Sequence, residues 1–202
     1  MIDTGGDRRI SVMPDGVWLS NMAAGTIIRI DPKTNMLGTP VSAGPAGIGP
    51  CQPVVGAFKS LWVALCGSRG LARVTVASEK PAEVVTAKPA ETATDKTAGK
   101  MPGKPAEKAK DESPVTVAVD VRNAGPLTTG TGSVWMITDT AGTVARIDPD
   151  TNSVVAEISM PAGATAIAFA SGAIWVASSS SDTVTRIDAE TNVVDETIKV
   201  GR

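Results

Sequence analysis

The sequence contains no histidine and no tyrosine among its 202 residues, and only two phenylalanines. Histidine is the commonest general base and the commonest transition-metal ligand in proteins. The chain therefore cannot supply a histidine-based catalytic triad or a histidine metal site. The sequence also lacks a strong excess of positive or negative charge. Its 19 basic and 21 acidic residues give a net charge of −2, so no basic surface for nucleic acid is indicated.

A long hydrophobic run is also absent. The longest uncharged stretch, residues 158–181, is interrupted by Pro161, Gly163, Gly172 and four consecutive serines. A membrane-spanning helix needs about 20 consecutive apolar residues, so we interpret this stretch as short buried strands joined by turns. The first seven residues lack the apolar segment of a signal peptide.

What the sequence does contain is a repeat marked by tryptophan. Each of the four tryptophans lies between two aliphatic residues, and an arginine follows each of them by eleven positions. The pairs are Trp18 and Arg29, Trp62 and Arg73, Trp135 and Arg146, and Trp175 and Arg186. Three of the arginines open the triplet Arg-Ile-Asp, and a Thr-Asn pair follows in register at Thr34-Asn35, Thr151-Asn152 and Thr191-Asn192. The same eleven-residue spacing from tryptophan to arginine in all four places indicates a true repeat.

The spacing of the repeat indicates the fold. The tryptophans lie 44, 73 and 40 positions apart, and a period near 40 is typical of propeller blades. Each copy contains four β-rich runs separated by Gly, Ser, Asp and Asn, which suits four antiparallel strands. We therefore predict an all-β chain, a β-propeller with four blades of four antiparallel strands, over residues 8–202. The expected blades cover residues 8–44, 48–123, 125–161 and 164–200.

The repeated residues have a structural interpretation. The tryptophans should fill the space between neighbouring sheets, and each arginine should lay its guanidinium against packed neighbours or pair with an aspartate. In the Asp-Pro-x-Thr-Asn element, Asp can accept backbone N–H bonds, Pro presets φ and Asn tolerates the left-handed region. Ala189 replaces the proline in the fourth copy, which the turn should tolerate.

The second copy is interrupted by an insertion. Residues 79–113 consist mainly of Ala, Lys, Pro, Glu and Thr, with seven lysines and seven acidic residues. Such a segment cannot bury enough apolar surface to order itself, so we predict a disordered loop within blade 2, with a partner-binding tail as the alternative. It joins the expected third and outer strands, on the face opposite the loops between second and third strands. We therefore do not expect it to cover a site there.

Cys51 and Cys66 are the only two cysteines. The innermost hairpin of blade 2 should turn around residues 57–60, which would place the two cysteines directly opposite each other on antiparallel strands. Opposed residues bring their Cβ atoms close enough for a disulfide, so we predict one; two reduced thiols are the alternative, and a metal pair is less favoured. A disulfide implies the periplasm or the outside of the cell. We then expect the natural N-terminus of the parent protein to be absent from this chain.

The pattern of small-aliphatic-Trp-aliphatic, followed by Thr-Val-x-Arg-Ile-Asp-Pro-x-Thr-Asn-x-Val-Val, resembles the YVTN-type propeller repeats. It is also similar to the virginiamycin B lyase (streptogramin lyase) group of bacterial propellers, over nearly the whole chain except the insertion. Closed four-bladed propellers exist, but the resemblance implies six or seven blades. We therefore expect an arc of a larger propeller, whose exposed end blades would self-associate. The resembling lyases use a histidine base and a magnesium ion, and no histidine is present here.

Two classes of function remain. The one we favour is a non-catalytic binding or scaffold propeller that presents inter-strand loops to a small molecule, a glycan or a protein. The alternative is a streptogramin-lyase-like or gluconolactonase-like metal-dependent enzyme, with Mg²⁺ or Ca²⁺, in a longer parent chain. The candidate binding-face residues lie in loops after the second strands: Asn21, Ser68, Arg69, Asp139, Ser179 and Ser180. Because this set has one carboxylate, we predict a weak hydrogen-bonding face or plain solvated loops, and no catalytic residue, metal or cofactor.

Overall fold

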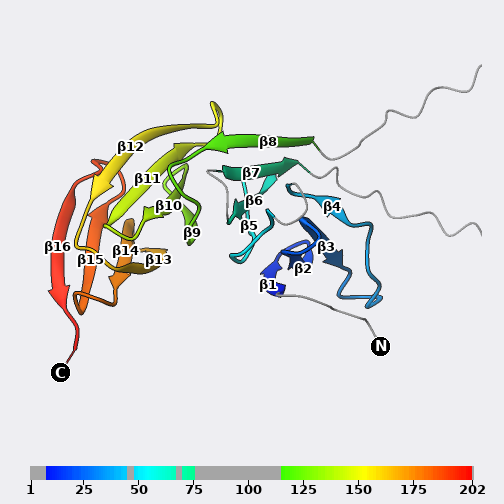
Figure 1. Cartoon of the computed structure of the whole chain (residues 1–202), viewed down its shortest axis with the longest axis horizontal. Coiled ribbons are helices and arrows are strands. Elements are labelled where there is room, and N and C mark those ends of the chain that lie inside the picture. The colour runs from blue at the N-terminus through cyan, green and yellow to red at the C-terminus, as the bar shows by residue number, and fades with distance from the viewer. Residues whose placement is uncertain (1–7, 45–47, 67–69, 76–114, 202) are drawn as a thin grey trace, which may run out of the picture. The chain divides into compact units, whose positions relative to one another are not determined.

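The computed structural model describes residues 8–44, 48–66, 70–75 and 115–201 (Figure 1). These residues form sixteen strands in four antiparallel sheets of four strands each, with no helix among them. The predicted class, an all-β propeller with four four-stranded blades, is confirmed. The predicted insertion at residues 79–113 lies outside the described residues, as do Ser68 and Arg69. Within the described ranges there is thus no helix of the length and apolar character needed to cross a membrane.

The strands follow the chain blade by blade, and their order in each sheet is their order in the sequence. Blade 1 consists of β1 (Arg8–Met13), β2 (Gly16–Asn21), β3 (Thr26–Ile30) and β4 (Val41–Ser42), and blade 2 of β5 (Val55–Ala57), β6 (Ser60–Leu65), β7 (Gly70–Thr75) and β8 (Val115–Asp120). Blade 3 consists of β9 (Leu127–Gly130), β10 (Ser133–Asp139), β11 (Thr143–Asp148) and β12 (Ser153–Ser159), and blade 4 of β13 (Ala164–Ala170), β14 (Ala173–Ser178), β15 (Thr183–Asp188) and β16 (Val194–Lys199).

The tryptophan and arginine of each repeat are direct partners across the second and third strands of their blade. The register pairs Trp18 with Arg29, Trp62 with Arg73, Trp135 with Arg146, and Trp175 with Arg186. The four tryptophans therefore occupy equivalent positions on the second strands of their blades. In blades 2, 3 and 4 the guanidinium carbon lies 5.3, 5.2 and 5.9 Å from the centroid of the paired indole ring. At this separation the cation and the ring quadrupole attract each other.

Apolar side chains from neighbouring blades share one core cluster at each junction. The clusters join Trp18 to Leu61 of blade 2, Trp62 to Met136 of blade 3, and Trp135 to Ile174 of blade 4. Each of these three tryptophans thus packs against the next blade along the chain, as the sequence predicted. Burying a large aromatic side chain in this way is a main source of stability.

The turn that follows the third strand repeats with the same hydrogen bonds. In three of the four copies the Asp Oδ1 accepts the backbone N–H groups two and three positions further on, at Asp31, Asp148 and Asp188. The closing residues Asn35, Asn152 and Asn192 have φ angles of 57°, 54° and 62°, in the left-handed region. Both predicted roles, Asp as acceptor and Asn as the left-handed residue, are confirmed.

The same N–H bonds perturb two of these carboxyl groups. The pKa of Asp31 is lowered chiefly by the backbone N–H of Lys33, and that of Asp188 chiefly by the backbone N–H of Thr191. A hydrogen bond donated to the charged carboxylate favours that form. The lowered pKa means that the contribution of each group to stability is fully present above the unfolded-state pKa and is lost as pH falls through the folded-state value.

The innermost hairpin of blade 2 turns at Phe58 and Lys59, as predicted. Their φ angles are 54° and 55°, and two successive positive φ angles are the mark of the type I′ turn that joins hairpin strands. A side chain with a Cβ in the left-handed region is strained by about 1–2 kcal/mol per residue.

Replacing Lys59 with glycine is expected to stabilise the protein by about 0.5–1 kcal/mol, because the relieved strain exceeds the entropy that glycine adds to the unfolded chain. Urea denaturation measures the change. The matched control is Lys33→Gly, also an exposed lysine in a turn but without a positive φ angle. It should lose about 0.5–1 kcal/mol. The same sign of change in both variants would contradict the argument.

The structure contains the Cys51–Cys66 disulfide, with the two Cα atoms 5.6 Å apart, inside the range of about 4.4–6.8 Å that disulfides require. The predicted opposition of the two residues is wrong, however. The backbone N–H of Cys51 donates to Ala64 O (3.3 Å), and that of Cys66 donates to Gly49 O (3.2 Å). The cysteines are therefore diagonal neighbours. The hairpin register shifts before it reaches them because Pro53 has no N–H for the ladder, and residues 51–54 leave the strand.

Candidate functional site

The predicted binding-face residues that the structure describes lie at or just after the ends of the second strands. Asn21 ends β2, Asp139 ends β10, and Ser179 and Ser180 follow β14. The Asn21 Oδ1 accepts the backbone N–H of Ala24 (3.2 Å), and the Asp139 Oδ1 accepts that of Thr143 (3.0 Å). Both side chains therefore close the turn in which they lie, as short polar side chains often do.

The serines after β14 are bound to the connection between β12 and β13. The backbone N–H of Ser179 donates to Gly163 O (2.9 Å), and the Ser180 hydroxyl donates to Ala162 O (3.0 Å). Gly163 has a φ of 87°, and a Cβ at that position would lie 1.8 Å from the Ser180 Oγ. The close approach requires glycine, so this serine pair ties a loop in place.

These side chains do not form one cluster through direct contacts. In the part of the chain that the structure describes, no hydrogen bond or ion pair joins Asn21, Asp139 and Ser180 to one another. Each lies in the equivalent connection of a different blade, and each uses hydrogen-bonding capacity within its own surroundings. A ligand that contacts all of them would have to span several blades.

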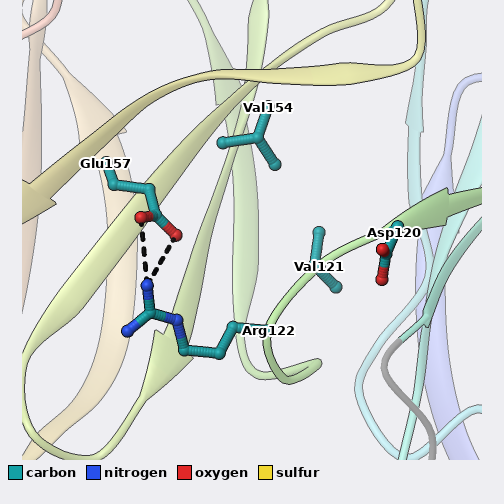
Figure 2. Close-up of a pocket in the computed structure, with 5 residues that line it drawn as sticks. All are labelled: Asp120, Val121, Arg122, Val154 and Glu157. Carbon is teal, nitrogen blue, oxygen red and sulfur yellow. Dashed lines mark hydrogen bonds and ion pairs between the residues drawn. The ribbon is translucent and has the colours of Figure 1, made fainter.

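A groove of about 240 Å³ lies at the junction of blades 2 and 3. Its lining residues are Asp120, Val121, Arg122, Val154 and Glu157. Figure 2 shows the Arg122 and Glu157 side chains pointing toward each other on one side, Asp120 on the other, and the two valines between them. The groove is therefore lined by charged groups at both sides and by two valines between them.

Arg122 connects this groove to the predicted set. Its Nη2 lies 3.1 Å from Glu157 Oε2, and its Nη1 lies 3.9 Å from Asp139 Oδ2. The Arg122 side chain is 58% exposed, so each ion pair contributes about 1 kcal/mol or less. Sequence reasoning missed Arg122 and Glu157 because neither belongs to the repeated motif. What distinguishes Arg122 and Glu157 in the sequence is that they are charged residues at positions where the other copies have no matching charge.

The two carboxyl groups with a lowered pKa, Asp31 and Asp188, lie in the turns after the third strands and do not line this groove. Among the described residues, no three His, Cys, Asp or Glu side chains are grouped so that they could hold a metal ion.

One repeated contact between blades was also missed from the sequence. The Arg73 Nη1 donates to Asn152 Oδ1 (3.1 Å), and the Arg146 Nη1 donates to Asn192 Oδ1 (2.9 Å). The arginine of one blade thus binds the turn asparagine of the next blade. The signal was present, since Arg and Asn recur in register, but Asn was assigned only to the conformation of its turn.

The sequence matches no protein-family model and no curated protein. Solved structures do share its fold. Over 96% of this chain and 55% of the other, it superposes on the structure of a streptogramin B lyase with a TM-score of 0.68 and 13% identity. For hydrazine synthase of Kuenenia stuttgartiensis the TM-score is 0.66 at 13% identity, over 93% and 47% of the two chains. For glutaminyl cyclase of Myxococcus xanthus it is 0.53 at 13% identity, over 98% and 72%.

The fold is that of a β-propeller. The chain spans about half the length of the first two structures that it matches. At 13% identity the likeness concerns the arrangement of strands, because one propeller scaffold carries many unrelated sites.

Proposed function

We propose that this propeller acts without catalysis, as a binding or scaffold module that presents its inter-strand loops to a small molecule, a glycan or a protein partner. The observation that carries the proposal is the position of Asp139, the one carboxylate among the predicted loop residues. Its Oδ1 accepts the Thr143 N–H and its Oδ2 faces Arg122. A general base must reach the proton that it removes, and this carboxylate instead holds a turn and an arginine.

The resemblance to streptogramin lyases implies a histidine base and a magnesium ion, and the residues present do not fit either. The sequence has no histidine. Asp139 is the one acidic member of the predicted set, and both of its oxygens already have protein partners. We therefore propose no resident metal or cofactor for this chain.

The alternative is a streptogramin-lyase-like or gluconolactonase-like enzyme that binds Mg²⁺ or Ca²⁺ within a longer parent protein. The similarity to the streptogramin B lyase structure favours this alternative, because the chain spans 55% of that structure. The remaining length of a longer protein could supply a histidine.

The disulfide supports a further part of the proposal, that the parent protein resides in the periplasm or is secreted. Disulfides persist in oxidising compartments and are rare in the cytosol. The Cys51–Cys66 pair closes a short loop at the start of blade 2.

Incubation with a streptogramin B antibiotic and magnesium is expected to give no turnover above a no-protein control, because no positioned base is present to start the elimination. Liquid chromatography of the intact and opened antibiotic measures this. Saturable binding without turnover, measured by titration calorimetry, would support a binding function. Turnover clearly above the control would overturn it.

Where binding is found, the groove residues locate it. Arg122→Gln should weaken binding by about tenfold to a hundredfold, since a charge-assisted hydrogen bond contributes about 1.5–3 kcal/mol. The matched control, Lys199→Gln, removes an exposed cation on β16 and should leave binding unchanged.

A further inference from the structure

The inner hairpin of blade 2 has a shorter first strand than those of the other blades. Strand β5 has three residues, whereas β9 has four, β1 six and β13 seven. The ladder between β5 and β6 ends where Val55 pairs with Trp62. Pairing resumes only at one isolated bridge, between Pro50 and Leu65. Residues 51–54 therefore form a bulge in which four residues lie opposite two of β6.

Two backbone hydrogen bonds and the disulfide close the hairpin beyond this bulge. The Cys51 N–H donates to Ala64 O (3.3 Å), and the Cys66 N–H donates to Gly49 O (3.2 Å). The disulfide joins the two residues that donate these bonds. Pro53, within the bulge, has no N–H to add to the ladder. A covalent bond thus holds the end of the hairpin at which the ladder is interrupted.

Blade 4 has the same backbone hydrogen bond without a disulfide. Ser179 occupies the repeat position of Cys66, four residues after the tryptophan of its blade, and its N–H donates to Gly163 O (2.9 Å). There the ladder between β13 and β14 continues as far as Ser178, the residue before Ser179. The ladder therefore reaches this hydrogen bond in blade 4 and stops short of it in blade 2. The disulfide takes the place of the missing ladder pairs.

Both redox states of the two cysteines fit the surrounding structure. Each cysteine residue is half-buried, at the surface of the blade, and partly exposed disulfides are the ones that exchange with thiols most readily. The Cys51 Sγ lies 3.8 Å from Ala64 O, and the Cys66 Sγ lies 3.7 Å from Ala124 O. A thiol is a weak donor, and each of these carbonyl groups is within its reach. Reduction therefore leaves both sulfhydryl groups with an acceptor.

The segment that the disulfide holds also contacts the loop after β2 in blade 1. A Cβ on Gly49 would lie 2.2 Å from Met22 O, so the two backbones are in close contact. Met22 follows Asn21, one of the predicted binding-face residues. Cys66 itself lies at the same offset from its tryptophan as Asp139 of blade 3. A movement of residues 49–54 therefore changes the loop face of two neighbouring blades.

We propose that the Cys51–Cys66 disulfide is a redox switch that a dithiol reductant opens. One thiolate of the reductant attacks a sulfur of the disulfide and forms a mixed disulfide, and its second thiol then displaces the protein thiolate. The S–S bond of the protein breaks, and the two thiols of the reductant become a disulfide. Two electrons and two protons pass to the cysteines, which become thiols. Residues 49–54 then detach from β6 while the blades stay folded, and oxidation restores the closed state.

Reduction of the folded protein is the first test. In dithiothreitol without urea, iodoacetamide is expected to label both cysteines while circular dichroism still shows a folded protein. A reduced sample transferred to oxidised dithiothreitol should lose its labelling. The double variant Cys51→Ser, Cys66→Ser should remain unlabelled throughout. A disulfide that stays closed until urea unfolds the protein would overturn the proposal.

Hydrogen exchange of single amides, measured by nuclear magnetic resonance, tests which part opens. On reduction, the protection of the Cys51 and Cys66 N–H groups should fall by about tenfold or more, because the segment then opens without global unfolding. The Ser179 N–H is the matched internal control, since it makes the equivalent hydrogen bond in blade 4, and its protection should not change. The double variant should show the reduced pattern with and without dithiothreitol.

Two results of the exchange measurement would contradict the switch. Equal protection of Cys51 and Cys66 in both redox states would show that the hydrogen bonds hold the segment without the disulfide. An equal loss at Ser179 would show that reduction loosens the whole protein. All of these measurements are made on the protein alone, so their outcome does not depend on whether the loop face binds a ligand.

Discussion

Replacing Trp135 with alanine is expected to lower the free energy of unfolding by about 4 kcal/mol, as for other buried tryptophans. Trp135 is 0% exposed and shares a core cluster with Ile174 of the next blade. Its indole N–H donates to Gly130 O (3.1 Å), and the Arg146 guanidinium lies 5.2 Å from its ring. Alanine removes all of these contacts and leaves a cavity between two sheets. Urea denaturation followed by circular dichroism measures the loss.

Trp175→Ala is the matched control for this prediction. Trp175 has the same register, donates its indole N–H to Ala170 O (3.1 Å) and lies beside Arg186, but it is only half-buried. The expected loss is about 2 kcal/mol, since less apolar area returns to water. Both variants are compared at concentrations at which the chain is monomeric. Equal losses would contradict the view that packing against the next blade makes the repeated tryptophan stabilising.

The repeated residues made most of the fold predictable. An arginine eleven positions after each tryptophan is what a hairpin between second and third strands requires, because the two residues then face each other across the ladder. The Asp-x-x-Thr-Asn turn was predictable for a local reason, since its hydrogen bonds lie within a few residues of one another. Both the strand pairing and the turn are therefore formed mainly by residues close in the sequence, and packing between blades changes them little.

The partners of the arginines were less predictable, because they depend on positions that vary between copies. The Nε of Arg73 and of Arg146 donates to a serine two positions before the tryptophan, Ser60 (2.9 Å) and Ser133 (2.8 Å). Blade 1 has glycine there, and the Nε of Arg29 donates to Asp15 O (2.9 Å) instead. The acceptor of the arginine Nε thus differs between blades, but in each of these blades the half-buried cation has an acceptor for this N–H group.

The candidate site was the least predictable part of the molecule. The sequence predicted Asn21, Asp139 and Ser180 in loops after the second strands; Asn21 and Asp139 are the last residues of such strands and Ser180 follows one, since the repeat fixes where those strands end. Whether their side chains face a ligand or close a turn depends on neighbours that the repeat does not specify, such as Arg122 beside Asp139. A site of this kind arises from departures from the repeat, which a search for recurring residues does not detect.

Removal of the disulfide is expected to lower the free energy of unfolding by about 3 kcal/mol, because an open loop of this length gains entropy in the unfolded chain. Cys51 and Cys66 are 15 positions apart. They tie the segment before β5 to the end of β6, where the hairpin register has shifted and residues 51–54 are not in a strand. The double variant Cys51→Ser, Cys66→Ser should therefore unfold at a lower urea concentration than the oxidised protein.

Reduction separates the effect of the bond from the effect of the substitutions. Dithiothreitol should lower the urea midpoint of the unchanged protein toward that of the double variant, and should leave the double variant where it is. The slope of the free energy against urea should rise on removal of the bond, because a chain without the cross-link exposes more surface when it unfolds. Equal midpoints for the oxidised and reduced protein would show that the hydrogen bonds of Cys51 with Ala64 and of Cys66 with Gly49 hold this segment without the disulfide.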